Sequence, residues 1–243
     1  MTLTKILFID IETAPQTEFV NDLPENLQKL WLEKTDMLRQ KMPEKFPENL
    51  SDDEIFMKNA GIYSEFAKII CISAGLFYKK DDEQFFRIKS FAGDDEKQLL
   101  NDFCALVKKF FTTNEHLICG HNIKEFDIPF ICRRLLINEL PIPKSINAMG
   151  KKSWETSFID TLELWRFGDY KNYTSLKLLS AVFDIPTPKD DIDGSQVAEV
   201  FYKEKNLTRI VQYCQKDVIA TARLFQKLNS IKMIEDEFVE IVE

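Results

Sequence analysis

The stretch FIDIETAP, residues 8–15, follows two apolar residues near the start of the sequence and predicts a buried strand. Side chains alternate between the two faces of a strand, and the face that starts with Ile6 and Phe8 continues into Asp10 and Glu12. The opposite face is also apolar, which indicates a central strand covered on both sides. Two neighbouring buried carboxylates repel each other and lose hydration, so they need a cation or another partner. The alternative is a strand end that emerges into solvent with both acids hydrated.

Length and composition favour one large domain, residues 1–243. The 44% of apolar residues and the 20 phenylalanines can form a sizeable core. The net charge of −8 argues against binding nucleic acid by charge alone, but it does not exclude an enzyme that meets phosphates through metal ions. The five cysteines are scattered and form no CxxC pair, so we expect reduced core thiols in a cytoplasmic protein. No stretch predicts a membrane span or a signal peptide.

Residues 16–66 differ from the rest of the chain because they are polar, contain several prolines and include two helical stretches. The second stretch opens at Ser51 with Glu54 three positions later, which is the spacing of a capping box. We therefore predict a helical insertion or lid within the single domain, directly after the first strand.

The remaining chain alternates strand-like and helical patterns. We expect strands at 68–77, 85–91, 117–122 and 157–161, helices at 97–111, 128–138, 161–167 and 174–183, loops at 144–154 and 186–196, and helix again from 195. Within the second loop, the stretch DIDGSQ at 191–196 could line a substrate cleft. Strands followed by alternating strands and helices predict an α/β fold, with a mixed β-sheet flanked by helices.

Two further acids lie in apolar surroundings. Asp127 comes soon after Gly120-His121-Asn122 ends a strand, and it opens an apolar helix, where it could be an ordinary N-cap. Tyr213 and Asp217 are four residues apart and share one face of the last long helix. Asp217 could lie at the solvent border of that helix. Alternatively, the four carboxylates could form one oxygen cage for hard divalent cations such as Mg²⁺ or Mn²⁺.

These motifs resemble the DEDD superfamily of 3′→5′ exonucleases, which have the ribonuclease H-like fold. The D-x-E of the first motif matches Asp10 and Glu12, and the acid after G-H-N-x-x-x-F matches Asp127. The third motif matches Tyr213 and Asp217, and it is similar to the tyrosine (DEDDy) subclass. The whole layout looks most like bacterial predicted exonucleases related to the proofreading domain of family B DNA polymerases.

The resemblance implies a reaction and roles for these residues. We expect metal-dependent hydrolysis of phosphodiester bonds at a 3′ end by a two-metal-ion mechanism, with two Mg²⁺ or Mn²⁺ ions. Asp10 would bridge the ions, Glu12 and Asp217 would complete the first site, and Asp127 would hold the second. Tyr213 would orient the attacking water, because its ordinary pKa near 10 suits positioning better than strong base catalysis.

Three residues next to the motifs occupy positions that contact the terminal nucleotide in the family: Thr13, Asn122 and Phe126. Phe126 could stack a base, or it could be a core side chain, and Asn122 could instead cap the strand end. Lysines of the 144–154 loop could meet phosphates, although lysines are more often solvated.

We expect nucleic acid with a free 3′ end as the partner, single-stranded DNA in preference to RNA, and no membrane. Replication or repair proteins could associate with the chain. One alternative is an exoribonuclease of the ribonuclease D type, and another is a non-catalytic nucleic-acid-binding domain that retains the fold. A proofreading subunit bound to a polymerase is a third.

Overall fold

The computed structural model describes residues 2–186 and 192–242, and it has a six-stranded sheet in the order β5-β4-β1-β2-β3-β6. The strands are β1 (Ile6–Pro15), β2 (Ala67–Lys80), β3 (Glu83–Ala92), β4 (Leu117–Gly120), β5 (Phe158–Asp160) and β6 (Val239–Val242). β2 runs antiparallel to both of its neighbours, whereas every other adjacent pair is parallel. The predicted mixed sheet flanked by helices is confirmed, and the arrangement is consistent with a ribonuclease H-like exonuclease fold.

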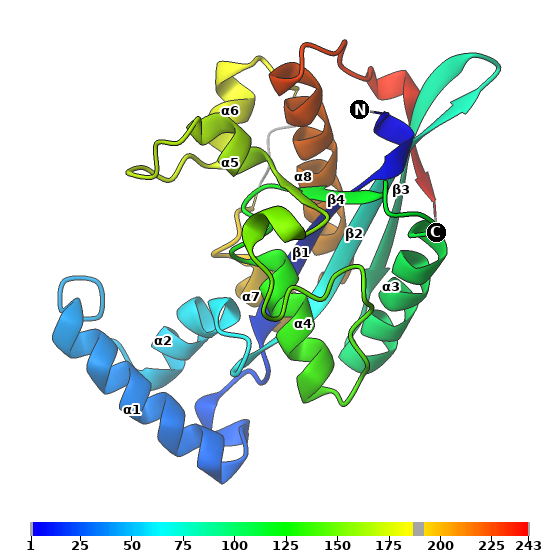
Figure 1. Cartoon of the computed structure of the whole chain (residues 1–243). Coiled ribbons are helices and arrows are strands. Elements are labelled where there is room, and N and C mark those ends of the chain that lie inside the picture. The colour runs from blue at the N-terminus through cyan, green and yellow to red at the C-terminus, as the bar shows by residue number, and fades with distance from the viewer. Residues whose placement is uncertain (1, 187–191, 243) are drawn as a thin grey trace.

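Strand β1 lies inside the sheet, and both of its faces are covered. Leu7 and Ile9 pack into the core formed with α3 (Glu96–Phe110) and α4 (Asp127–Ile137). Phe8 points to the other face, where α8 (Leu207–Leu228) lies, and its ring meets that of Phe225 at 5.7 Å. Figure 1 shows α8 and the α3–α4 pair on opposite sides of the strands. The two-sided burial predicted from FIDIETAP is therefore present.

Close approach of α8 to the sheet depends on a glycine in β2. A Cβ at Gly75 would lie 2.4 Å from Cζ of Phe86 and 2.9 Å from Cγ1 of Val218. Neither separation is tolerated in a packed core, so the missing side chain allows α8 to lie flat on β2. Asp217, the one acid of α8, is thereby held near the sheet.

The segment between β1 and β2 is helical, as predicted. It contains α1 (Glu25–Lys41) and α2 (Asp52–Asn59), which extend to one side of the sheet in Figure 1. The expected capping box is present, because Ser51 Oγ accepts from the Glu54 N–H and Glu54 Oε2 accepts from the Ser51 N–H. The segment has its own core around the fully buried Trp31.

A buried ion pair joins the end of this segment to the main body. Arg134 of α4 makes two hydrogen bonds with Glu96 of α3, at 2.8 and 2.6 Å. Arg134 also donates to the Ser64 carbonyl, and Glu96 accepts from the Ile69 N–H. Each charge thus has partners, as a buried charge requires.

Three expectations from the sequence need correction or lie outside the described residues. The helix expected to run on from 195 is broken: α7 (Val197–Glu199) and a π-helical turn end at Lys205, whose φ of 54° is left-handed, before α8 begins. Strand β6 was not expected. In the 186–196 loop, residues 187–191 lie outside the described residues. Among the described residues, no helix is long and apolar enough to cross a membrane.

Candidate active site

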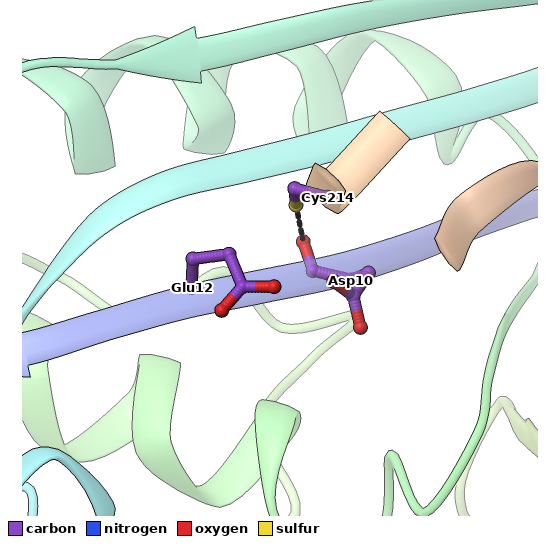
Figure 2. A group of neighbouring side chains, drawn as sticks. All are labelled: Asp10, Glu12 and Cys214. Atoms are coloured by element: carbon purple, nitrogen blue, oxygen red, sulfur yellow. Dashed lines mark hydrogen bonds between the residues drawn. The ribbon is translucent and has the colours of Figure 1, made fainter. Parts of the chain in front are cut away.

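Two acids, Asp10 and Glu12, lie within β1 (Ile6–Pro15). Asp10 is partly buried and Glu12 is buried, and one oxygen of each lies within 4.8 Å of the other and of Cys214 Sγ. Figure 2 shows Asp10 and Glu12 next to each other along β1, with Cys214 beside the backbone of Asp10. Asp10 Oδ2 is buried and has no hydrogen-bond partner among the described residues. A buried oxygen of this kind calls for a cation or a proton.

The electrostatic surroundings of both acids are unfavourable to negative charge. Burial raises the pKa of Asp10 well above its ordinary value, and Glu12, Asp217 and Asp127 raise it further. The pKa of Glu12 is raised well above its ordinary value by burial first, and then chiefly by Asp217. The four predicted acids therefore act on one another, although they come from β1, α4 and α8. Solvent exposure, the alternative for the end of β1, is wrong for Glu12.

Asp127 is the first residue of α4 and is buried. Burial raises its pKa to about 7, hydrogen bonds to the backbone at Asp127 and Ile11 oppose the shift, and Asp160 and Asp217 add to it. The N-cap position of α4 belongs to Phe126, so the simple capping interpretation of Asp127 is wrong. Asp127 instead turns a carboxyl group toward the end of β1, close to the other acids.

Tyr213 and Asp217 lie one turn apart in α8, as their spacing predicts. A hydrogen bond joins the Tyr213 hydroxyl to Asp217, and the pKa of Tyr213 is raised by burial first and then by Asp217, Glu12 and Asp10. The hydroxyl therefore stays protonated and donates to the carboxylate. This geometry suits a group that positions a neighbour, and it does not suit a base.

Cys214 borders the acids, and its thiol is engaged with the backbone of β1. Its thiol donates to the backbone carbonyl of Asp10, with 3.4 Å between Sγ and O, as the dashed line in Figure 2 shows. Burial, followed by the neighbouring Cys71, raises its pKa well above the ordinary value, so the thiol is protonated. The oxygens that remain form a carboxylate set, which fits Mg²⁺ or Mn²⁺ better than a thiophilic metal. The unpartnered Asp10 Oδ2 supports the same fit.

Asp160, which we did not predict from the sequence, holds the loop after β4. Its Oδ1 accepts from the N–H of Asn122 at 2.9 Å and from that of Leu162 at 2.9 Å, and its Oδ2 accepts from the N–H of Lys124 at 3.2 Å. Both oxygens are therefore engaged with backbone, which makes Asp160 a positioning residue. The sequence does contain a signal for Asp160, because this acid follows the apolar residues Phe158 and Ile159 much as Asp10 follows an apolar run.

His121 fastens the same loop on its other side. Its Nε2 lies 2.9 Å from the Thr174 carbonyl oxygen, which can only accept, so Nε2 carries the proton. The Nδ1 atom then accepts from the Thr161 hydroxyl at 2.9 Å. Burial lowers the pKa of His121, which keeps the ring neutral.

The three predicted nucleotide-contacting residues have different surroundings. The Thr13 hydroxyl donates to the Gly61 carbonyl at 2.7 Å, so it is already engaged. Phe126 is half-buried and its ring lies 5.4 Å from that of Phe130, which favours the core interpretation. Asn122 has a left-handed φ of 61°, and its buried Oδ1 has no partner among the described residues. Of the three, Asn122 has the side chain most available to a ligand.

The lysines of the 144–154 loop lie elsewhere. Lys144 and Lys151 line a cavity of about 560 Å³ together with Thr113 and Asn114, which precede β4. The acids lie beyond the opposite end of β4, because β1 and β4 are parallel and Phe8 pairs with Cys119. These lysines are therefore separate from the acidic site.

Comparison with known proteins adds one match. A family model described as a predicted 3′-5′ exonuclease related to the exonuclease domain of PolB matches residues 62–240. The matched range includes Asp127, Tyr213 and Asp217, and it leaves out Asp10 and Glu12. No curated protein matches the chain.

Proposed function

We propose that this chain, which belongs to the family of predicted 3′-5′ exonucleases related to the exonuclease domain of PolB, removes nucleotides from the 3′ end of nucleic acid with the help of two divalent ions. The observation that carries the proposal is the buried, unpartnered Oδ2 of Asp10 within a set of acids whose pKa values are raised. Such acids destabilise a protein unless a cation joins them. We further propose that residues 1–243 act as one domain, with residues 16–66 inserted in it.

The proposed ligands are Asp10, Glu12, Asp127 and Asp217, and Mg²⁺ or Mn²⁺ would be the ions. Such ions, when bound, lower the pKa of water and stabilise the charge on the leaving oxygen. The carboxylates come from three elements that are rigidly held: β1 inside the sheet, α4 tied to α3 by the Arg134 ion pair, and α8 packed on β2. That rigidity supports a role in holding reacting groups in line.

Tyr213 has a positioning role in this proposal. Its protonated hydroxyl donates to Asp217, so it fixes the orientation of that carboxylate and presents an oxygen to a water beside it. The Tyr213 and Asp217 spacing supports the tyrosine subclass of the superfamily. Asn122, with its free amide oxygen, is the proposed contact for the terminal nucleotide.

DNA is the proposed substrate, because the matching family is named for its relation to the exonuclease domain of PolB. RNA, as in ribonuclease D, is the second candidate, since the same acids serve both substrates. A non-catalytic domain is disfavoured, because clustered acids with raised pKa values would destabilise the protein without contributing to any activity. Replication or repair proteins remain the proposed partners.

The test compares the wild-type protein with Asp10→Asn and with Glu33→Gln, which alters an exposed acid of α1. Each protein receives labelled single-stranded DNA or RNA of one sequence, with Mn²⁺ and with either a free or a blocked 3′ end. We expect stepwise shortening of the free-ended strand by wild type and Glu33→Gln, and none by Asp10→Asn. Activity that survives in Asp10→Asn, or shortening of blocked strands, would overturn the proposal. Comparing the rates of shortening of DNA and RNA identifies the preferred substrate.

A further inference from the structure

Exposed aromatic side chains are concentrated in one loop. The segment 167–175 joins α5 (Thr161–Arg166) to α6 (Leu176–Val182), and in it Phe167, Tyr170 and Tyr173 have exposed fractions of 89%, 73% and 63%. Only two other aromatic side chains are exposed among the described residues, Phe19 and Trp154. Aromatic rings are normally buried on folding, so three exposed rings within seven residues indicate a surface that contacts a ligand.

The backbone of this loop keeps the rings away from the core. Phe167 has a left-handed φ of 45° and Gly168 follows with a φ of 89°, which turns the chain out of α5. The Asp169 N–H then donates to the Arg166 carbonyl at 2.7 Å, and the Lys171 N–H donates to Asp169 Oδ1 at 3.0 Å. Figure 1 shows the segment between α5 and α6 projecting away from the sheet.

The inner end of the loop meets the acidic site. The His121 ring, which fastens the loop after β4, lies edge-on to Tyr173 with 6.4 Å between ring centres, and its Nε2 donates to the Thr174 carbonyl. The chain runs on from His121 through Asn122 to Asp127. Tyr173 thus contacts the loop that leads from β4 to Asp127, whereas Phe167 and Tyr170 are the more exposed rings.

Positive charge accompanies the rings. The guanidinium of Arg166 lies over the Tyr170 ring at 5.7 Å, and Lys171 is exposed in the loop itself. Rings interleaved with cations are the combination that binds single-stranded nucleic acid, because bases stack on the rings and phosphates meet the cations.

We propose that the loop at 167–173 is a stacking platform for unpaired nucleotides on the 5′ side of the bond to be cut. The inference rests on the proposed function and adds a substrate-binding site to it. Bases that are paired in a duplex cannot offer their faces to these rings, so a blunt duplex end gains nothing from the loop.

The test is a double variant, Phe167→Ala with Tyr170→Ala, compared with Ile241→Ala. Ile241 is an exposed apolar residue of β6, at the far edge of the sheet from β5. Fluorescence anisotropy in EDTA measures the Kd for a fluorescein-labelled oligothymidine, without hydrolysis. We expect the double variant to raise this Kd by about fivefold or more for each ring removed, and Ile241→Ala to leave it unchanged. The Kd for a blunt duplex should be the same in all three proteins.

Either of two outcomes overturns the loop assignment: an unchanged Kd for the single strand in the double variant, or an equal loss of affinity for the duplex. Because the altered side chains are exposed, we expect the variants to fold like wild type, and melting curves check this. Shortening of the strand by wild type with Mn²⁺ is measured separately. If wild type shortens the strand while the double variant binds normally, the loop assignment fails and the exonuclease proposal stands. If wild type shortens nothing, the exonuclease proposal fails and the binding result decides the loop assignment alone.

Discussion

Changing Asp127 to Asn is expected to stabilise the metal-free protein while abolishing its proposed activity. The pKa of this carboxyl is about 7 in the folded chain against 3.8 for an ordinary aspartate, chiefly because the group is buried. At about 1.4 kcal/mol per pKa unit, the difference between these two pKa values corresponds to about 4 kcal/mol. The folded chain is destabilised by this amount once Asp127 is ionised in both the folded and unfolded chains. Asparagine has a similar shape and no charge, so it removes that cost.

The sign of the pH dependence follows from the raised pKa. The folded chain holds the Asp127 proton more tightly than the unfolded chain does. The protonated group therefore contributes fully to the free energy of unfolding below about pH 4, and this contribution is lost as the pH rises to about 7. Between about pH 5 and pH 8 the stability lost through this group alone is about 2–3 kcal/mol. The pKa values of Asp10 and Glu12 are raised too, which adds to the slope in the same direction.

Urea denaturation in EDTA, followed by tryptophan fluorescence, measures the free energy of unfolding across this pH range. Wild type should lose stability as the pH rises, and Asp127→Asn should be more stable than wild type by about 2–4 kcal/mol at about pH 8, with a shallower slope. Glu33→Gln, which removes an exposed acid, should follow wild type. Adding Mn²⁺ should restore stability to wild type and have less effect on Asp127→Asn. A wild-type stability that does not fall with pH in EDTA, or a variant with the same slope, would refute the reasoning.

Three further changes test other parts of the structure. Asp160→Ala removes the acceptor of three backbone N–H groups, and we expect a loss of about 1–3 kcal/mol in urea denaturation together with weaker Mn²⁺ binding; unchanged unfolding would contradict the positioning role. Tyr213→Phe keeps the ring but loses the hydrogen bond to Asp217, so kcat on single-stranded DNA should fall by about 10²-fold with unaltered stability, and an unaltered kcat would exclude the hydroxyl from the reaction. Arg134→Met leaves Glu96 buried without its cation, which should cost about 3–5 kcal/mol, whereas Arg134→Met combined with Glu96→Met should recover much of that loss.

The sequence predicted the fold class because its strongest patterns were long and periodic. The buried first strand, the amphipathic helix that became α3 and the capping box at Ser51 each depend on neighbours within a few residues, and each is present. The break at Lys205 and strand β6 were missed. A lysine carries no preference for a left-handed φ, and β6 is a four-residue strand whose only described pairing is with the distant β3.

The candidate site was predicted in the same way, from acids that interrupt apolar patterns. Asp10, Glu12 and Asp217 were noticeable because each lies on or beside an apolar face of its strand or helix. In the structure, burial and the negative charge of Asp217 raise the pKa values of Asp10 and Glu12. Asp160 stands out locally as an acid after an apolar stretch, but its role, like that of Tyr173, depends on contacts with residues about 40 or more positions away, which local patterns do not contain. Roles of that kind require the three-dimensional arrangement.

The hydrogen bond from Cys214 to the Asp10 carbonyl joins positions 204 residues apart, and three of the four proposed metal ligands, Asp10, Glu12 and Asp217, come from the same two regions of the chain. Bringing such distant segments together carries a large loop-closure cost, so this contact forms only when β1 and α8 have both found their places on β2. A partly synthesised or partly unfolded chain has no complete set of carboxylates and cannot assemble the proposed cutting centre. Ion binding would therefore report that β1, α4 and α8 have all reached their native positions.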